Sequence, residues 1–113
     1  MPRPTKIGRS PPAAVEESLA RLGRNIRTAR LRRKLPQGAL AERMGVSRFV
    51  VADLERGKPT TGVAAYLGAL WVLGLLGDMR AVADPDRDDE GKALERARGP
   101  RRAGLRRVLS DDF

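Results

Sequence analysis

The sequence lacks both cysteine and histidine, and its 113 residues include only one tryptophan, one tyrosine and two phenylalanines. The absence of cysteine excludes disulfides and thiolate metal sites, and the absence of histidine excludes histidine-based catalysis. No other residues form a nucleophile, base or metal constellation, so we expect no enzymatic activity, no metal and no cofactor. Because aromatic residues are scarce, the core must be built from leucine, valine, isoleucine and alanine.

Long hydrophobic runs are also missing. The most apolar stretch, residues 63–76, is interrupted by Gly68 and Gly74. It is shorter than the roughly 20 apolar residues that a membrane-spanning helix requires. The N-terminus shows no hydrophobic segment of a secretory signal, and a chain without cysteine suits a reducing compartment. We therefore expect a cytoplasmic protein with no membrane partner.

Positive charge is in large excess, with a formal net charge of +9. The excess lies in residues 1–34, which hold ten Lys or Arg and two acidic residues, whereas residues 81–113 hold eight of each. Such a charge favours an anionic polymer as partner. On charge alone, a ribosomal or simply soluble basic protein is an equal alternative, and an RNA-binding protein is a weaker one.

The two ends of the chain have compositions that disfavour a packed core. Residues 1–12 contain four prolines, Gly8 and three cations, so residues 1–15 are predicted to be a disordered basic arm. Residues 84–113 have few apolar and many charged residues, which predicts a charged, mostly disordered tail. An acidic cluster in this tail lacks the glycine and distal glutamate of a calcium-binding loop, so we interpret it as a solvated charge run. Its members are Asp84, Asp86, Asp88, Asp89 and Glu90.

Between these ends, the apolar residues recur at the three- and four-residue spacing of helices. The first helix is expected from Glu16 to about Lys34, with Ser18 as a candidate cap. Its inward residues are Leu19, Leu22, Ile26 and Ala29. Further helices are expected at residues 36–44, 48–56 and 61–73, with a short fifth helix at residues 78–82.

The second and third of these helices are joined by a very short turn. Gly45 ends the second helix, because glycine tolerates the left-handed conformation that closes a helix. Val46 follows as a hydrophobic plug, and Ser47 is a suitable N-cap for the third helix. With the small residue Ala41 in the second helix, this arrangement predicts a helix-turn-helix, in which the second of the two helices enters the major groove of DNA.

The run LPQGALAERMGVSRFVVADLERGKP carries these features and resembles the Cro/CI family, also called XRE. The resemblance covers residues 22–76 and implies an all-α, five-helix lambda-repressor-like helix-turn-helix domain, here over residues 16–83. The segment YLGALWVLGLLGDM, followed by Asp-Pro and a basic tail, is more loosely similar to HipB-like antitoxins.

The resemblance also implies roles for individual residues. Gln37 matches a phosphate-binding position, and Arg30 and Glu55 match a partly buried ion pair. The expected DNA-binding residues are Gln37, Ser47, Arg48, Phe49, Asp53, Arg56 and Lys58. Two departures from the family pattern affect the second helix. Pro36 replaces the usual Ser or Thr cap, and Gly38 weakens the helix by up to about 1 kcal/mol relative to alanine.

The helix expected at residues 48–56 would be the recognition helix, the one that enters the major groove. Three of its expected exposed positions admit more than one interpretation. Arg48 can bond guanine O6 and N7 or contact only a phosphate, and we weigh the two equally. Phe49 can pack on a thymine methyl group, or it can fold back onto the second helix. Asp53 can accept a bond from cytosine N4, but we favour a helix-surface position repelled by DNA.

The helix at residues 61–73 is apolar on two faces, so both faces must be covered. One stripe consists of Val63, Leu67, Leu70 and Leu73. The other stripe consists of Ala64, Gly68, Trp71 and Leu75, which we predict to form a dimer seam in preference to a simple core.

These features together predict a sequence-specific transcriptional regulator, a repressor that binds a palindromic operator in double-stranded DNA as a homodimer. Such a protein would associate with the nucleoid when bound to DNA. The alternative is a HipB-like antitoxin that neutralises a partner toxin through its C-terminal tail and autoregulates its operon.

Overall fold

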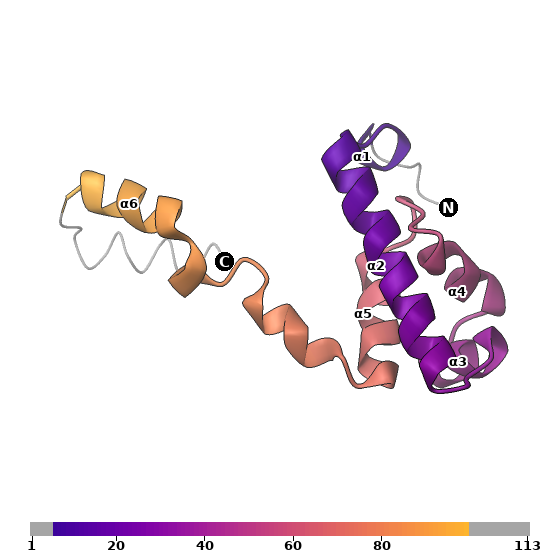
Figure 1. Cartoon of the computed structure of the whole chain (residues 1–113). Coiled ribbons are helices and arrows are strands. Elements are labelled where there is room, and N and C mark those ends of the chain that lie inside the picture. The colour runs from indigo at the N-terminus through magenta and orange to yellow at the C-terminus, as the bar shows by residue number, and fades with distance from the viewer. Residues whose placement is uncertain (1–5, 100–113) are drawn as a thin grey trace. The chain divides into compact units, whose positions relative to one another are not determined.

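A computed structural model describes residues 6–99, and every regular element within that range is helical (Figure 1). The α-helices are α1 (Lys6–Arg9), α2 (Ala13–Arg32), α3 (Gln37–Met44), α4 (Arg48–Glu55), α5 (Val63–Leu73) and α6 (Asp89–Ala97). Two 3-10 helices, η1 (Leu76–Ala81) and η2 (Pro85–Arg87), lie between α5 and α6. The all-α prediction is therefore confirmed. The chain divides into two compact units between Gly77 and Asp78.

The first unit has one aliphatic core that α2, α3, α4 and α5 surround. The long helix α2 packs on α4 and α5, and α3 packs on the same two helices (Figure 1). The buried apolar residues are Ile26, Ala29, Leu40, Ala41, Val51, Leu54, Tyr66, Ala69, Leu70 and Leu73. Tyr66 is the one aromatic residue among them, as the scarcity of aromatic residues led us to expect.

The turn between α3 and α4 has the predicted geometry. Gly45 adopts the left-handed conformation, with φ of 74°, at the end of α3. The amide of Val46 then donates to the carbonyl oxygen of Ala41 over 3.0 Å, which satisfies one of the last carbonyl groups of the helix. Ser47 occupies the N-cap position of α4 with extended backbone angles, but its side chain makes no capping hydrogen bond. The backbone alone therefore directs α4 away from α3.

The N-terminal boundary of the main helix was predicted too late. α2 begins at Ala13 with Pro12 as its N-cap residue, since proline already has a φ that suits the start of a helix. Ser18 lies inside the helix and donates to the carbonyl oxygen of Ala14 over 2.9 Å, so it is not a cap. The expected disorder also fails at α1 and at residues 13–15, whereas residues 1–5 of the predicted arm lie outside the described residues.

The predicted disorder of the tail is likewise wrong at η2 and α6. Both short helices begin with an aspartate cap: Asp84 Oδ1 accepts from the amide of Asp86 over 3.0 Å, and Asp88 Oδ1 accepts from the amide of Gly91 over 2.9 Å. Such caps satisfy amide groups that the first turn of a helix leaves without partners. Residues 100–113 of the tail lie outside the described residues.

The assignment of faces on α5 also needs correction. The core face consists of Tyr66, Ala69, Leu70 and Leu73, whereas Val63, which the sequence analysis placed in one stripe with Leu70 and Leu73, is 69 % exposed. Both sets of residues have helical spacing in this almost uniformly apolar helix. Periodicity therefore did not distinguish them, and only the position of α2, α3 and α4 selects the buried face.

Two glycines allow α2 to approach the end of α4 closely. A Cβ atom at Gly23 would lie 2.5 Å from the carbonyl oxygen of Leu54, and one at Gly57 would lie 2.6 Å from the amide nitrogen of Ala20. Gly57 also has a φ of 72°. Both contacts involve backbone, which cannot rotate away as a side chain can. These two glycines therefore set the distance between the helices.

We predict opposite effects of alanine at two helical glycines. Gly23→Ala should lower the free energy of unfolding by about 1–3 kcal/mol, because the added methyl group meets backbone of α4. Gly38→Ala should raise it by about 0.5–1 kcal/mol, because nothing lies within 4 Å of the added atom and alanine favours helix. Chemical denaturation of the two variants measures both effects, and a stable Gly23→Ala protein would contradict the close approach.

Candidate nucleic-acid interface

The first turn of α4 projects its side chains into solvent. Ser47, Arg48 and Phe49 are all exposed, and Phe49 retains 70 % of its accessible surface. Val51 and Leu54 on the opposite face are fully buried. Phe49 does not fold back onto α3, which was the alternative interpretation from the sequence. The N-terminal end of α4 thus presents a hydroxyl group, a cation and an aromatic ring to solvent.

The side chains of Arg48 and Phe49 lie against each other. The guanidinium carbon of Arg48 is 5.5 Å from the centroid of the Phe49 ring, within the range of a cation–π contact. Such a contact restricts the rotamers of both side chains while leaving the edge of the guanidinium group open. Neither residue makes a side-chain hydrogen bond or ion pair with another described residue.

Asp53 has two cationic partners at the other end of α4. Its Oδ1 atom lies 2.6 Å from Arg56 Nη2, and its Oδ2 atom lies 3.5 Å from Lys58 Nζ. All three groups remain at least partly exposed. The carboxylate therefore holds two cations on one side of α4, and this arrangement agrees with a helix-surface position better than with a contact to cytosine.

The buried end of α4 carries an ion pair with α2. Arg30 Nε lies 2.6 Å from Glu55 Oε2, and Arg30 Nη2 donates to Glu55 Oε1 over 2.9 Å, so the pair is bidentate. Both residues are only 6 % exposed. Arg30 Nη1 also donates to the carbonyl oxygen of Leu35 over 2.9 Å. The structure thus brings together the two residues that the family resemblance paired.

Gln37 has a partner within the protein that the sequence did not indicate. Its Nε2 atom donates to Glu55 Oε1 over 3.1 Å, and the side chain is half-buried. Glu55 is the last residue of α4, where the helix dipole disfavours a negative charge. Three hydrogen bonds, two from Arg30 and one from Gln37, stabilise the carboxylate there. The Gln37 amide therefore joins α3 to this pair, whatever it binds outside the protein.

The matched family agrees with this geometry. A comparison with protein families matches residues 21–83, more than half of the chain, to the helix-turn-helix domain. The chain belongs to the helix-turn-helix family. Comparisons with curated proteins and with solved structures return no match. The matched residues include α3, the turn and α4. The similarity to HipB-like antitoxins stays a prediction.

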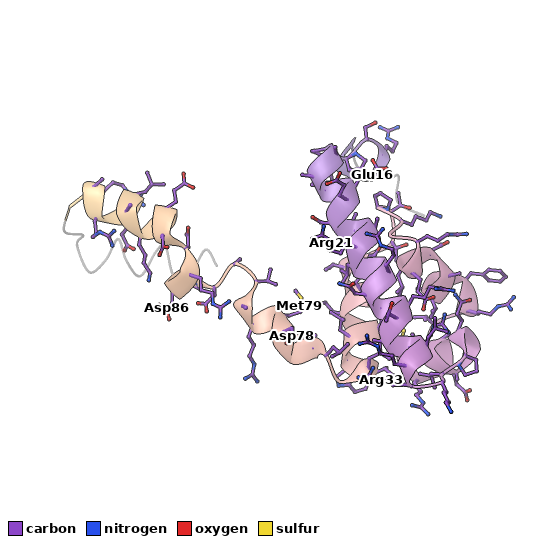
Figure 2. The ribbon with its side chains drawn as sticks, viewed as in Figure 1. Glu16, Arg21, Arg33, Asp78, Met79 and Asp86 are labelled. Atoms are coloured by element: carbon purple, nitrogen blue, oxygen red, sulfur yellow. The ribbon has the colours of Figure 1, made fainter. Side chains whose placement is uncertain are left out.

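Helix-turn-helix proteins bind DNA with the second helix of the motif, which in this chain is α4. Glu55, at the C-terminal end of α4, is buried against Arg30 of α2. Arg48 and Phe49, at the N-terminal end of α4, are exposed to solvent. Side chains around the motif are drawn in Figure 2, where Arg33 marks the α2 side of the junction with α3. This helix-turn-helix domain therefore has one polar side that can meet DNA and one buried side that fixes α4.

Tyr66 is a structural residue that the sequence analysis missed. Its hydroxyl group donates to the carbonyl oxygen of Lys58 over 3.0 Å, which ties the loop after α4 to α5. Burial raises the pKa of the Tyr66 phenol, and the negative charge of Asp53 raises it further. The spacing of Tyr66 with Ala69, Leu70 and Leu73 was the available signal. The buried Tyr66 side chain therefore fixes the backbone of Lys58, just after the end of α4.

The outer face of α5 differs in part from the predicted seam. Trp71 is 65 % exposed and Ala64 is exposed, but Gly68 and Leu75 are half-buried. A Cβ atom at Gly68 would lie 3.7 Å from the side chain of Met44, so this glycine faces α3. The neighbouring Val63 extends the exposed apolar surface instead. Most of the Trp71 side chain is therefore open to solvent.

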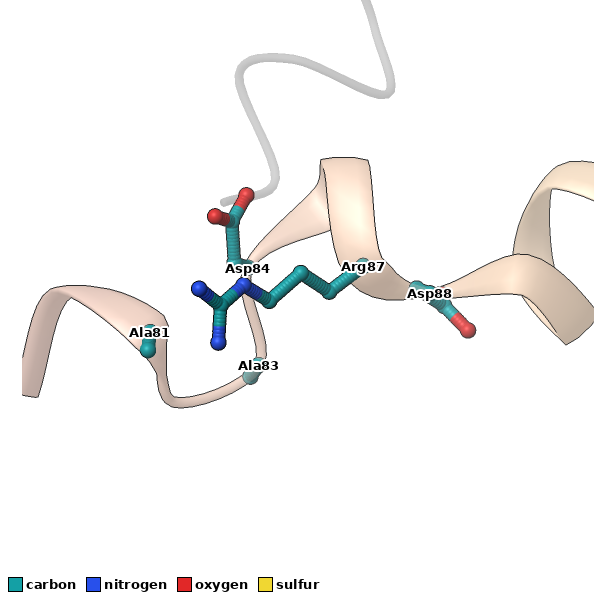
Figure 3. A pocket seen from close by; sticks show the side chains of 5 residues that line it. All are labelled: Ala81, Ala83, Asp84, Arg87 and Asp88. Carbon is teal, nitrogen blue, oxygen red and sulfur yellow. The ribbon is translucent and has the colours of Figure 1, made fainter.

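The second unit holds no metal-binding group within the described residues. A surface hollow between η1 and η2 is lined by Ala81, Ala83, Asp84, Arg87 and Asp88 (Figure 3). Both aspartates use a carboxylate oxygen to cap a helix, so two of the five residues of the acidic cluster have a structural role. Within residues 6–99, no helix is both long and apolar enough to cross a membrane.

We predict that Glu55 is essential for stability. Glu55→Ala leaves Arg30 as an unpaired buried charge and should lower the free energy of unfolding by about 3–5 kcal/mol. Asp53→Ala is the matched control, because it removes only partly exposed ion pairs, with Arg56 and Lys58, from the same helix and should cost no more than about 1 kcal/mol. Thermal and denaturant unfolding measure the difference. Equal melting of the Glu55→Ala and parent proteins would contradict the role of the buried pair.

Proposed function

We propose that the protein is a sequence-specific transcriptional repressor that binds a palindromic operator in double-stranded DNA as a homodimer. The observation that carries this proposal is the exposed first turn of α4, where Arg48 and Phe49 project from a helix whose other end is fixed by a buried ion pair. A rigidly held helix with an exposed N-terminal turn is the element that helix-turn-helix proteins insert into the major groove.

The charges around α4 support an anionic partner. Arg48, Arg56 and Lys58 are exposed, and Arg43 at the end of α3 is exposed as well. Asp53 is paired with two of these cations, so its repulsion of phosphates is partly cancelled. Cations at the ends of the recognition helix can contact phosphates and position the helix, while side chains of its first turn contact base edges.

The homodimer is supported by the outer face of α5. This helix has no charged residue, and its exposed surface includes Val63, Ala64 and Trp71. In a chain with a net charge of +9, two copies can approach through such a neutral face without like-charge repulsion. Aromatic residues such as Trp71 are enriched where interfaces are fully buried. A two-fold pair of domains would also match the symmetry of a palindromic site.

Substitution of Arg48 tests specific binding. Arg48→Ala should weaken binding to the preferred sequence by about 1–3 kcal/mol and relax the preference at one base pair of each half-site. Arg21→Ala removes the same charge from the exposed side of α2 and should leave the order of preferred sequences unchanged. Selection from a random duplex library followed by titration measures both. If Arg48→Ala lowers affinity equally for all sequences, Arg48 contacts phosphate and not a base.

Substitution of Trp71 tests the dimer. Trp71→Ala should shift the protein to monomer and weaken operator binding, because it removes the largest exposed apolar side chain of α5 without touching the core. Trp71→Phe keeps an aromatic ring and should retain more of the dimer. Sedimentation velocity reports the oligomeric state, and circular dichroism checks the fold. A Trp71→Ala protein that is still dimeric at low micromolar concentration would place the seam elsewhere.

A further inference from the structure

We propose that Arg48 and Phe49 read one dinucleotide step as a unit, in which a guanine lies next to a pyrimidine that carries a 5-methyl group. Thymine and 5-methylcytosine both satisfy this requirement, whereas unmodified cytosine does not. The inference rests on the proposed function, because it specifies what the same helix recognises on DNA.

Phe49 determines the methyl requirement. Its ring is 70 % exposed in the first turn of α4, although the guanidinium group of Arg48 lies against it. A phenylalanine ring can make no conventional hydrogen bond to a base edge. The apolar feature that the major groove presents is the C5 methyl group of thymine, which apolar side chains contact. A 5-methylcytosine presents the same group at the same ring position.

Arg48 determines the guanine requirement. Its guanidinium carbon lies 5.5 Å from the Phe49 centroid, so the ring limits the positions that the guanidinium group can adopt. No described residue pairs with this guanidinium group through an ion pair or side-chain hydrogen bond. The donors along its edge therefore remain available, and two of them match the O6 and N7 acceptors of guanine.

The contact between the two side chains places both targets within one step. Consecutive base pairs are about 3.4 Å apart along the helix axis. The guanidinium group of Arg48 and the ring of Phe49 are 5.5 Å apart. With part of this separation across the groove and part along the helix axis, the two groups can contact neighbouring base pairs. A G·C pair without modification has no methyl group, so the methyl group must come from the adjacent pair. This geometry predicts that cytosine methylation strengthens binding wherever cytosine replaces the thymine of the step.

The first experiment deletes a single methyl group from the DNA. Selection from a random duplex library identifies the preferred half-site, and deoxyuridine then replaces thymine at each position. At the position beside guanine, we expect about a fourfold loss of affinity, which is the effect of one apolar carbon. Phe49→Ala should abolish this difference between thymine and deoxyuridine. It should weaken but not abolish the preference for guanine over 7-deazaguanine, which lacks N7, because Arg48 remains but loses the ring that limits its positions.

The second experiment adds the methyl group back. Cytosine in place of the thymine should bind as weakly as deoxyuridine or more weakly, and 5-methylcytosine should recover about fourfold in affinity over cytosine. Arg48→Ala is the complementary variant, which should lose the response to 7-deazaguanine. Both side chains are exposed, and thermal melting of each variant checks that the fold is intact.

The outcomes separate this inference from the proposed function. A protein that selects no duplex sequence would overturn both. A protein that selects a palindromic sequence but responds to none of the methyl changes would overturn only the dinucleotide reading. A methyl effect that persists in Phe49→Ala would assign the methyl contact to another residue and would also overturn it.

Discussion

The buried ion pair between Arg30 and Glu55 is the interaction on which the presentation of α4 depends. Arg30 joins α2 to the last residue of α4 and to the carbonyl oxygen of Leu35 in the loop before α3. Gln37 extends the same network into α3. Burying two charges costs free energy, and this cost is offset only where geometry and hydrogen bonding are both good. A bidentate pair with two further hydrogen bonds meets that condition and connects three helices at one point.

The glycines at the same junction make this pair geometrically attainable. Gly23 and Gly57 let α2 touch the backbone at the end of α4, and Arg30 lies seven residues after Gly23, two turns along the same face of α2. Beyond Gly57, the chain is held again where Tyr66 bonds to the carbonyl oxygen of Lys58. The recognition helix is therefore fixed at its buried C-terminal end, and its exposed N-terminal end can meet DNA at a defined angle.

The two ends of α4 have opposite chemistry for this reason. Its last residue is a buried carboxylate that needs protein partners, and its first residues are a cation and an aromatic ring that are both exposed to solvent. On α5, the same separation occurs between faces, since Tyr66 and Leu70 complete the core while Val63 and Trp71 stay in solvent. An aromatic side chain that stays in solvent forgoes the favourable free energy of burial. The exposed rings of Phe49 and Trp71 lie where the proposed partners, DNA and a second copy of the chain, would cover them.

Local chemistry in the sequence was sufficient to identify the motif. Gly45, Val46 and Ser47 define the turn through a left-handed glycine and an extended residue before the next helix, and such preferences depend on neighbours in the chain alone. The same holds for the aliphatic composition of the core. The helices at α1 and α6 were missed because overall polarity suggested disorder, although the aspartate caps of η2 and α6 were visible as local signals.

Only the tertiary structure decided which residues of similar pattern face which partner. On α5, two sets of apolar residues have helical spacing, and the positions of α2, α3 and α4 select Tyr66 for the core and expose Val63. Asp53 and Glu55 are both acidic residues of α4, yet one lies on the surface beside Arg56 and the other is buried against Arg30. The sequence by itself determined the order of the central helices and the turn between α3 and α4, because these follow from local backbone preferences. The partners of individual side chains required the fold, because they lie far apart in the chain and meet only through packing.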